Sequence, residues 1–282
     1  MLDLFLEIHL NEIDDLTFDH HCQSIGQSQL ELIATGRWGG VIVDRAIVDP
    51  LRELIPLVRT TTMYTSPVML FNQLHRKMVE EISKSLSMTM HDHQFSRTHA
   101  RTHQPSFNNA LIEIYDQDYK TMGFHSDQAL DLAKDSYIAI YSCYKNPSQA
   151  NRRLIIKNKT TKATCEILLK HNSVVCFSTE TNKQHLHKIV LDQTMKANEN
   201  EWLGITFRSS ETFVYFIDKD EPPGQPMLCG PRYLEPTSLR LATSEEKLAF
   251  YKARSLENAL VDHYYPLIDY TISPSDLIRV GL

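Results

Sequence analysis

Short runs rich in β-branched and aromatic residues dominate the middle of the chain, and polar segments such as KNPSQAN separate them. Such runs are typical of strands joined by turns. They occupy residues 110–116, 137–144, 152–158, 163–170, 172–178, 185–191, 202–209 and 212–217. Seven or eight short strands at this spacing favour a sandwich, a barrel or a jelly roll. We therefore expect a mainly β protein with flanking helices.

Two helices are expected outside this strand-rich region. Residues 66–86 carry apolar side chains at roughly helical spacing, which is typical of an amphipathic helix packed on a sheet. Thr243 and Glu246 form a capping-box pattern, so a second helix is predicted over about 244–262. Residues 222–231 are rich in proline and glycine and are predicted to link the strands to this helix.

The length of 282 residues allows one large domain, or a domain with a modest extension. We expect three segments along the chain. Residues 1–107 are predicted to form a mixed helix and strand segment that packs on the core. Residues 108–221 are predicted to form the core itself, and residues 222–282 the C-terminal linker and helix.

Composition and charge are typical of an ordinary intracellular protein, either cytoplasmic or nuclear. The chain has no run of about 18 apolar residues, and its first residues mix acidic with apolar side chains. Neither a membrane span nor a signal peptide is therefore expected. The five cysteines contain no CxxC pair, which favours reduced thiols over a disulfide framework. The net charge of −6 gives no global attraction to nucleic acid or to an anionic membrane.

His125 and Asp127, in the stretch GFHSDQALDL, are candidates for half of a metal site. Side chains two residues apart on an extended strand project from the same face, so an imidazole and a carboxylate can converge on one cation. Two histidines and one carboxylate leave three positions of an octahedral metal open, as in non-haem Fe(II) oxygenases. In a chain with 13 histidines, the His-x-Asp pattern alone is a weak signal.

Two later residues make the signal more specific. His187 lies in the strand-like run HLHKIVL, and Arg208 follows it by 21 residues in the apolar run WLGITFRSS. An arginine in such a strand is costly to bury unless it meets an anion, and its planar fork suits a carboxylate. The ordered set of histidine, aspartate, distal histidine and strand arginine is far more specific than any one of its parts.

This ordered set resembles the AlkB-like branch of the Fe(II)- and 2-oxoglutarate-dependent oxygenases. The resemblance covers about residues 108–216 and includes Tyr115 in IYDQDYKTMGFHSD, then HKIVL, then GITFR. It implies that the fold is a double-stranded β-helix, also called a jelly roll. It also implies that the iron ligands, which are the catalytic residues, are His125, Asp127 and His187.

The resemblance further implies how the co-substrate is bound and what reaction follows. Tyr115 and Arg208 would bind 2-oxoglutarate, and Ser210 would join Arg208 on the same carboxylate. With Fe(II), 2-oxoglutarate and O₂, the chain is expected to hydroxylate or demethylate its substrate. The resemblance favours a modified nucleobase or nucleic acid, while a protein side chain or a small molecule stays open. No membrane partner is expected.

Some positions leave alternatives open. Trp202 stands where the family usually has a second arginine, and Glu113 where it usually has an asparagine. Trp202 therefore keeps open a non-catalytic jelly-roll binding protein, or a co-substrate that is bound differently. A zinc hydrolase on the same three ligands is a weaker alternative, because no general base is apparent beside them. His185 shares a face with His187, but the HKIVL pattern favours His187 as the ligand.

Two basic segments are candidates for contact with an anionic substrate. Residues 91–103 contain four histidines and two arginines, for which we favour a solvated loop or a strand edge over a basic lip near the active-site mouth. A structural zinc site there is disfavoured because no cysteine lies nearby. Residues 152–162 are also basic, and the solvated face of a hairpin is the favoured interpretation.

Overall fold

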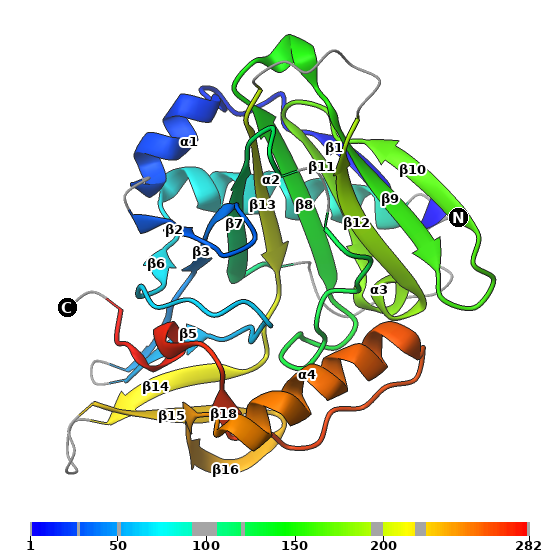
Figure 1. The fold of residues 1–282 in the computed structure, drawn as a ribbon. Coiled ribbons are helices and arrows are strands. Elements are labelled where there is room, and N and C mark those ends of the chain that lie inside the picture. Colours follow the sequence, from blue (N-terminus) through cyan, green and yellow to red (C-terminus); the bar gives the residue numbers. More distant parts are fainter. Residues whose placement is uncertain are drawn as a thin grey trace.

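The structure, a computed structural model, is shown as a ribbon in Figure 1. It describes residues 2–26, 29–49, 52–91, 106–119, 122–192, 200–217 and 224–280. Its α-helices are α1 (Phe18–Ile25), α2 (Gln73–His91), α3 (Thr179–Gln184) and α4 (Ser244–Ala259). Short 3-10 helices lie at Leu2–Leu4, Pro147–Gln149 and Pro274–Leu277.

The largest sheet is built from strands of both the N-terminal and the central part of the chain. Its strands are β1 (Leu6–His9), β2 (Glu31–Leu32), β3 (Trp38–Val43), β6 (Met69–Leu70), β7 (Asn109–Tyr115), β8 (Tyr137–Tyr144), β11 (Ser173–Ser178) and β13 (Trp202–Arg208). Their order is β1-β11-β8-β13-β7-β3-β2, and β6 pairs with β3. Neighbouring strands are antiparallel except for the β3–β6 pair.

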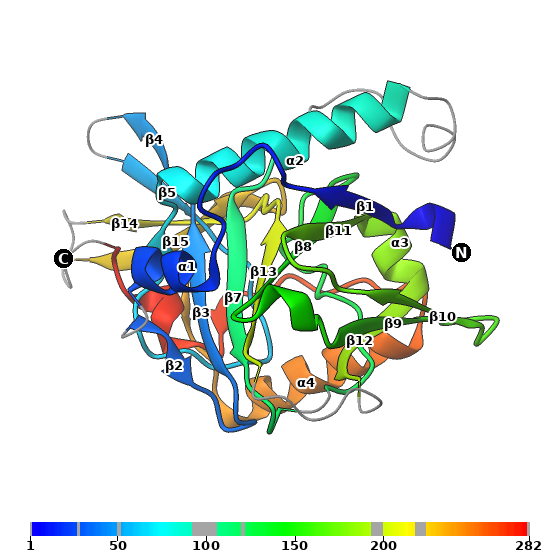
Figure 2. The same ribbon diagram turned by 90° about the horizontal axis from the view of Figure 1, so that it is seen from above.

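A smaller sheet faces this main sheet. It contains β9 (Arg152–Asn158), β10 (Thr164–Leu168) and β12 (His185–Leu191), in the order β10-β9-β12. Figure 2 shows the smaller sheet on one side of the main sheet and α2 on the other. Leu154, Ile156 and Ile189 of the smaller sheet belong to one buried cluster with Ile138 and Ile140 of the main sheet. These facing antiparallel sheets form the predicted jelly-roll core.

The burial pattern of the strands follows from this layering. Every residue of β8 is buried, because α2 covers one face of the strand and the smaller sheet covers the other. In β9 and β12, buried and half-buried residues alternate over most of each strand, because only one face of the smaller sheet is covered. The eight predicted strands are all present, with ends within two residues of the prediction.

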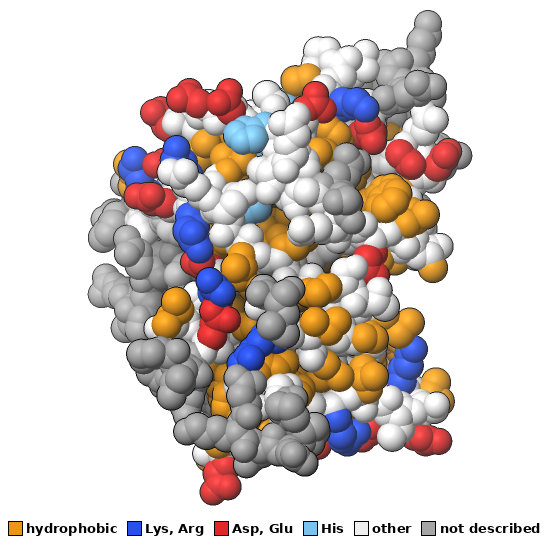
Figure 3. Space-filling model, turned by 90° about the vertical axis from the view of Figure 1, so that its left-hand side faces the viewer, with side chains coloured by type: hydrophobic (Ala, Val, Ile, Leu, Met, Phe, Trp, Pro, Cys, Tyr) orange, Lys and Arg blue, Asp and Glu red, His pale blue; other side chains and the backbone are white. Residues whose placement is uncertain are grey.

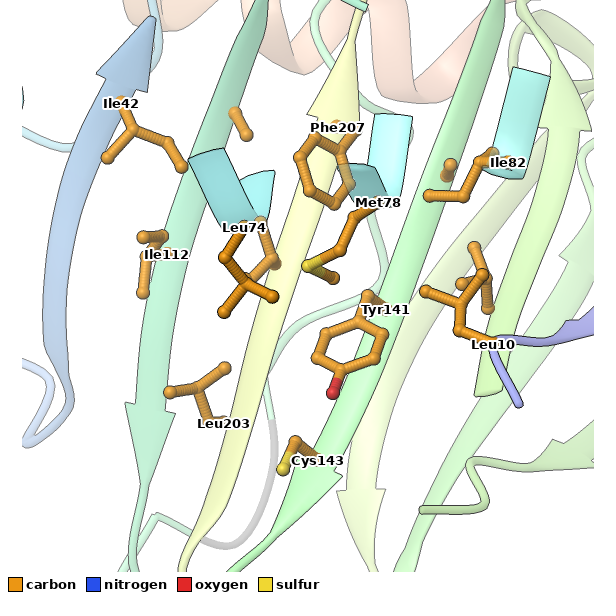
Figure 4. Close-up of a cluster of buried hydrophobic side chains, with 14 of the residues drawn as sticks. Leu10, Ile42, Leu74, Met78, Ile82, Ile112, Tyr141, Cys143, Leu203 and Phe207 are labelled. Carbon is orange, nitrogen blue, oxygen red and sulfur yellow. The ribbon is translucent and has the colours of Figure 1, made fainter. Parts of the chain in front are cut away.

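The outer face of the main sheet packs against α2 (Figure 4). Leu74, Met78 and Ile82 of the helix contact a buried cluster that includes Leu203 and Phe207 of β13. Burying each such side chain contributes about 1.5–3 kcal/mol. Because residues of a strand alternate between faces, residues 202, 204, 206 and 208 of β13 point to the other side, toward the smaller sheet. This side carries the candidate site.

Both predicted helices are present, although α2 begins later than expected. Its sequence is helical from Gln73, because residues 69–70 pair with β3 as a strand. The Asn72 side chain accepts a hydrogen bond from His75 N at 3.0 Å and so caps the first turn. For α4, the capping box between Thr243 and Glu246 is confirmed.

The predicted linker at 222–231 is wrong. Residues 225–230 form β15, which pairs with β14 and β16. Leu228 explains the difference, because it is fully buried in a cluster with Leu57 and Val214. This third sheet contains β4 (Ala46–Asp49), β5 (Arg52–Pro56), β14 (Phe213–Ile217), β15 (Gln225–Gly230) and β16 (Tyr233–Ser238), and a parallel pair joins β17 (Arg240–Leu241) to β18 (Tyr270–Thr271).

Two further expectations concern helices and cysteines. Among the described residues, no helix combines the length and the apolar character that crossing a membrane would require. The five cysteines form no disulfide, in line with the absence of a CxxC pair. Of the histidine-rich segment 91–103, all residues after His91 lie outside the described part of the chain.

Candidate active site

His125 and His187 are brought side by side by backbone pairing. His125 lies between β7 and β8 and forms an isolated antiparallel bridge with His187 of β12. His125 N donates to His187 O at 3.0 Å, and His187 N donates to His125 O at 2.7 Å. Directly opposed residues of an antiparallel pair project to the same side, and the two ring centroids are 4.6 Å apart.

Asp127 completes a group of three side chains that could hold a metal ion. One ligand atom from each of His125, Asp127 and His187 lies within 4.8 Å of the other two. His187 Nε2 is 3.5 Å from Asp127 Oδ1, and His125 Nε2 is 4.0 Å from the same oxygen. The structure therefore brings together the three residues that the sequence suggested as ligands.

His185 is directed elsewhere. Its Nδ1 lies 2.9 Å from Thr181 O, and its Nε2 lies 3.2 Å from Asn158 Nδ2. Both ring nitrogens are thus engaged by the protein, and the ring packs 6.0 Å from that of Phe5. Of the two histidines on this face of β12, His187 is the one that reaches the group.

The protonation states of these side chains suit a divalent cation. Burial, helped by the neighbouring His187, lowers the pKa of His125 to about 3, so its imidazole is neutral. Burial alone would raise the pKa of Asp127, but the charge of Arg208 and hydrogen bonds from His187 and Arg208 outweigh it. The pKa of Asp127 is held well below its usual value, and the carboxylate stays ionised.

The tautomer of His125 is fixed by its backbone neighbour. His125 Nδ1 lies 3.0 Å from the carbonyl oxygen of Gly123, to which it donates as an N–H. The lone pair of His125 therefore sits on Nε2, the nitrogen that faces Asp127. Two imidazoles and one carboxylate form the donor set of the non-haem iron sites that the sequence pattern suggested.

The segment that carries His125 and Asp127 is held from two helices. Asn182 of α3 accepts from Asp127 N at 2.7 Å and donates to Asp127 O at 2.8 Å. From α4, Asn258 accepts from Ser126 N at 3.0 Å. Glu257 of the same helix accepts from Ala129 N at 2.8 Å. These contacts join residues far apart in the chain, so no local sequence pattern predicts them.

Arg208 reaches the ligand group from the end of β13. Its Nε donates to Asp127 Oδ2 at 2.7 Å, and its side chain is largely buried. Its two terminal nitrogens have no protein partner among the described residues, although Arg208 lines a cavity. These nitrogens are therefore available to an anion that lies beside Asp127.

Tyr115 and Ser210 do not line this cavity. Tyr115 is fully buried, and its hydroxyl donates to Glu113 Oε2 at 2.7 Å. The Ser210 hydroxyl is directed at backbone oxygens, 2.5 Å from Leu57 O and 2.8 Å from Thr212 O. The structure therefore separates these two residues from Arg208, with which the sequence pattern had grouped them.

The cavity has a volume of about 320 Å³ and two polar ends. We call His125, Asp127, His187 and Arg208 the metal end. We call Arg37, Thr60, Thr62, Glu113 and Tyr119 the far end. Arg254 and Asn258 of α4 also line the wall, together with apolar residues that include Leu111, Ile140 and Ile189.

Arg37 and the two threonines are among the residues of the cavity that sequence reasoning missed. Arg37 precedes β3 in the short segment GRWGG, which reads as an ordinary polar turn. Thr60 and Thr62 lie in a segment of the described chain that has no helix or strand. No local pattern distinguishes them, because their neighbours in the cavity come from distant parts of the sequence.

Comparison with known proteins identifies the family. Residues 58–208 match the family model of the 2OG-Fe(II) oxygenase superfamily, and this match spans more than half of the chain. The chain belongs to this superfamily. Its activity is therefore that of a non-haem iron oxygenase that uses Fe(II), 2-oxoglutarate and O₂. The oxygenase predicted from the sequence is confirmed.

Two solved structures match the chain at low sequence identity. The structure of OsALKBH1 is 12% identical, covers 73% of this chain and 98% of that chain, and gives a TM-score of 0.48. A prolyl-4-hydroxylase from Pseudomonas putida is 11% identical, covers 73% of this chain and 92% of that chain, and gives a TM-score of 0.41. No curated protein matches the chain in sequence.

Proposed function

We propose that this 2OG-Fe(II) oxygenase acts on a modified nucleobase within nucleic acid, as the AlkB-like sequence pattern favours. In this proposal His125, Asp127 and His187 hold Fe(II), and Arg208 binds the keto-acid end of 2-oxoglutarate. The position of Arg208 supports this role, because its Nε contacts Asp127 and its terminal nitrogens are open to the same cavity.

The residues of the metal end prepare the site for this chemistry. When bound, Fe(II) with 2-oxoglutarate and O₂ supplies the oxidation of a carbon–hydrogen bond, which no side chain can perform. Arg208 keeps Asp127 ionised, and the backbone contacts of Asn182 and Asn258 fix the segment between the two ligands. The apolar wall formed by Leu111, Ile140 and Ile189 limits the access of water to the reacting atoms.

The substrate proposal rests on the surroundings of Phe124. This residue precedes His125 and lines the cavity. Lys188 Nζ lies 4.7 Å from the centre of the Phe124 ring, and Lys157 Nζ lies 5.5 Å from it. An aromatic ring for a base and two cations for phosphates are the contacts that single-stranded nucleic acid uses. Lys157 belongs to the basic hairpin segment noted in the sequence.

This basic group is local. The chain has a net charge of −6, and the face drawn in Figure 3 shows Lys and Arg side chains scattered among acidic ones. Attraction to phosphates is therefore expected around Phe124 and not across the whole molecular surface. We name the group formed by Phe124, Lys157 and Lys188 the basic rim.

The test is the affinity of the protein for a labelled single-stranded oligonucleotide that carries one methylated base. We expect Phe124→Ala to weaken binding by about 1–3 kcal/mol, because base stacking is lost. The double variant Lys157→Ala with Lys188→Ala should make the dependence of log K on log[salt] shallower by about 1.4, or about 0.7 for each lost phosphate contact.

A charge-matched control separates the basic rim from net charge. Lys84→Ala with Lys170→Ala removes two exposed lysines that lie outside the basic rim and pair with Glu81 and Glu7. The control should leave the salt slope unchanged. If both double variants change binding equally, or if the oligonucleotide does not bind at moderate salt, nucleic acid is not the substrate. Succinate release with peptides or small molecules would then identify the substrate class.

A further inference from the structure

The inner face of β13 carries an aromatic ring where a second cation would otherwise reach the cavity. Trp202 is fully buried, and its ring lies across Gly204. A Cβ atom at position 204 would lie only 2.0 Å from Trp202 Cη2, so the indole needs a glycine beneath it. The ring also packs against Tyr115, with 4.7 Å between centroids. β13 therefore offers the cavity one cation, Arg208.

A different strand brings a second arginine to the cavity. Arg37 directly precedes β3, whose first residue, Trp38, is opposite Ile114 of β7. Continued by one residue, this register sets Arg37 opposite Tyr115 and diagonal to Glu113, and the Arg37 and Glu113 side chains form an ion pair that is largely buried. Burial alone would lower the pKa of Arg37, but the charge of Glu113 outweighs it, so the pKa is raised and the guanidinium stays charged.

The outward nitrogens of Arg37 are bonded to hydroxyl groups. Nη1 donates to Thr35 Oγ1 at 2.7 Å and to Tyr119 OH at 3.4 Å, and Nη2 donates to Thr62 Oγ1 at 3.1 Å. A hydroxyl can rotate and donate its own hydrogen, so these groups can turn from accepting to donating when an anion arrives. The ion pair with Glu113 uses the opposite side of the guanidinium and fixes its position.

Both arginines line one cavity, as the binding of an anion with two charged ends requires. Along the paired strands, Arg208 is opposite Asn109, and Gly204 is opposite Glu113. These positions are four residues apart, or about 13 Å along a strand. Arginine side chains are long, so the separation of the two guanidinium groups is not set by the strand distance alone. The small side chain of Thr206 lies on the same face between these positions and lines the cavity.

We propose that Arg37, with Thr62 and Tyr119, binds the distal carboxylate of 2-oxoglutarate, in place of a second arginine on β13. This inference rests on the proposed function of the metal end, where Arg208 binds the keto-acid end. The far end thereby selects a dicarboxylate over a keto acid that has one carboxylate. Trp202 and Gly204 close the route that a cation from β13 would have taken.

The experiment compares two ligands that differ only at the distal end. Protein loaded with Mn(II), which binds ligands without turnover, is titrated anaerobically with 2-oxoglutarate and with pyruvate, which lacks the distal carboxylate. Water-proton relaxation of the bound Mn(II) reports both titrations. We expect Arg37→Met to weaken 2-oxoglutarate binding by about 10- to 100-fold and to leave pyruvate binding unchanged, because a charge-assisted contact is lost.

Two further variants make the result specific. Arg37→Lys keeps the charge and should recover part of the affinity for 2-oxoglutarate. Arg208→Met should weaken the binding of both ligands, because both contain the keto-acid end. The Mn(II) affinity and the thermal midpoint of each variant report whether the site and the fold are intact.

The outcomes separate the two proposals. If the wild-type protein prefers 2-oxoglutarate over pyruvate and Arg37→Met keeps that preference, the role of Arg37 is wrong while the metal end stands. If Arg37→Met weakens the binding of both ligands equally, the inference is also wrong, because Arg37 then affects the site as a whole and not the distal carboxylate. If Arg208→Met changes the affinity for neither ligand, Arg208 does not bind the keto-acid end, whatever the result for Arg37.

Discussion

At the metal end of the cavity Arg208 pairs with Asp127, whereas at the far end Arg37 pairs with Glu113. In each pair a largely buried guanidinium compensates a largely buried carboxylate, which is costly to bury alone. Each arginine also lines the cavity, but the terminal nitrogens of Arg208 have no partner among the described residues, whereas those of Arg37 donate to hydroxyl groups. The same chemical unit is thus used twice in one cavity.

The two ends differ in how they are held. At the metal end, backbone hydrogen bonds fix the ligands: His125 pairs with His187, and Asn182 holds both backbone groups of Asp127. At the far end, rotatable hydroxyl groups surround Arg37. A metal site needs ligands in fixed positions. A carboxylate site can use hydroxyl groups that rotate to donate a hydrogen bond to the ligand. This difference predicts that substitutions at the two ends have separable effects.

The largest expected effect is the loss of metal binding at the metal end. We expect His187→Ala to abolish measurable Mn(II) binding, because only two protein ligands remain. The matched variant His185→Ala should keep the metal, since both ring nitrogens of His185 are bonded within the protein. Anaerobic Mn(II) titration measures both. Metal loss in His185→Ala with retention in His187→Ala would reverse the assignment of the two histidines.

The next largest effect is expected on the free energy of unfolding, from a substitution of the buried Trp202. Trp202→Ala leaves a cavity where the ring packs on Tyr115 and Gly204, so we expect a loss of about 3–5 kcal/mol in the free energy of unfolding. Urea unfolding measures this loss. The Mn(II) affinity of the folded variant should stay at the wild-type value. A comparable loss of metal affinity would mean that the two ends are coupled.

A smaller effect is expected where α4 holds the ligand segment. Asn258→Ala removes the acceptor for Ser126 N, and we expect about a 10-fold weaker Mn(II) affinity, because such supporting contacts orient the ligands. Lys252→Ala, an exposed position of the same helix, is the matched control. Equal affinities for the two variants would show that α4 does not position the metal ligands.

The smallest effect concerns a single hydroxyl of the far end. Tyr119→Phe removes one acceptor of Arg37 and one possible donor to the distal carboxylate, so we expect 2-oxoglutarate binding to weaken by about 2- to 10-fold. Pyruvate and Mn(II) affinities should not change. The same relaxation titrations check this, and a change in pyruvate binding would place Tyr119 nearer to the metal end than the structure does.

Much of the fold could be predicted because its signals are local. The strands are short, apolar and bounded by polar turns, so each strand can be recognised from its own residues. The β15 strand was missed because its prolines and glycines are typical of a linker, while its burial depends on contacts of Leu228 with distant residues. The start of α2 was misplaced because Met69 and Leu70 have helical spacing but pair with β3.

For the candidate site, the residues of the metal end could be predicted from the sequence alone. His125 and Asp127 are two residues apart, and His187 and Arg208 lie in recognisable strands, so a pattern read along the chain groups them. Tyr115 and Ser210 belonged to the same pattern, but the tertiary structure turned their hydroxyls toward Glu113 and toward backbone oxygens.

The residues of the far end are brought together only by tertiary contacts. Arg37 and Glu113 are far apart in sequence and meet because β3 and β7 are neighbours in one sheet. The physical reason is that a charge becomes a binding group only when its burial, its partner and its distance from a cavity are fixed. The sequence states none of these for a residue whose contacts are all long-range.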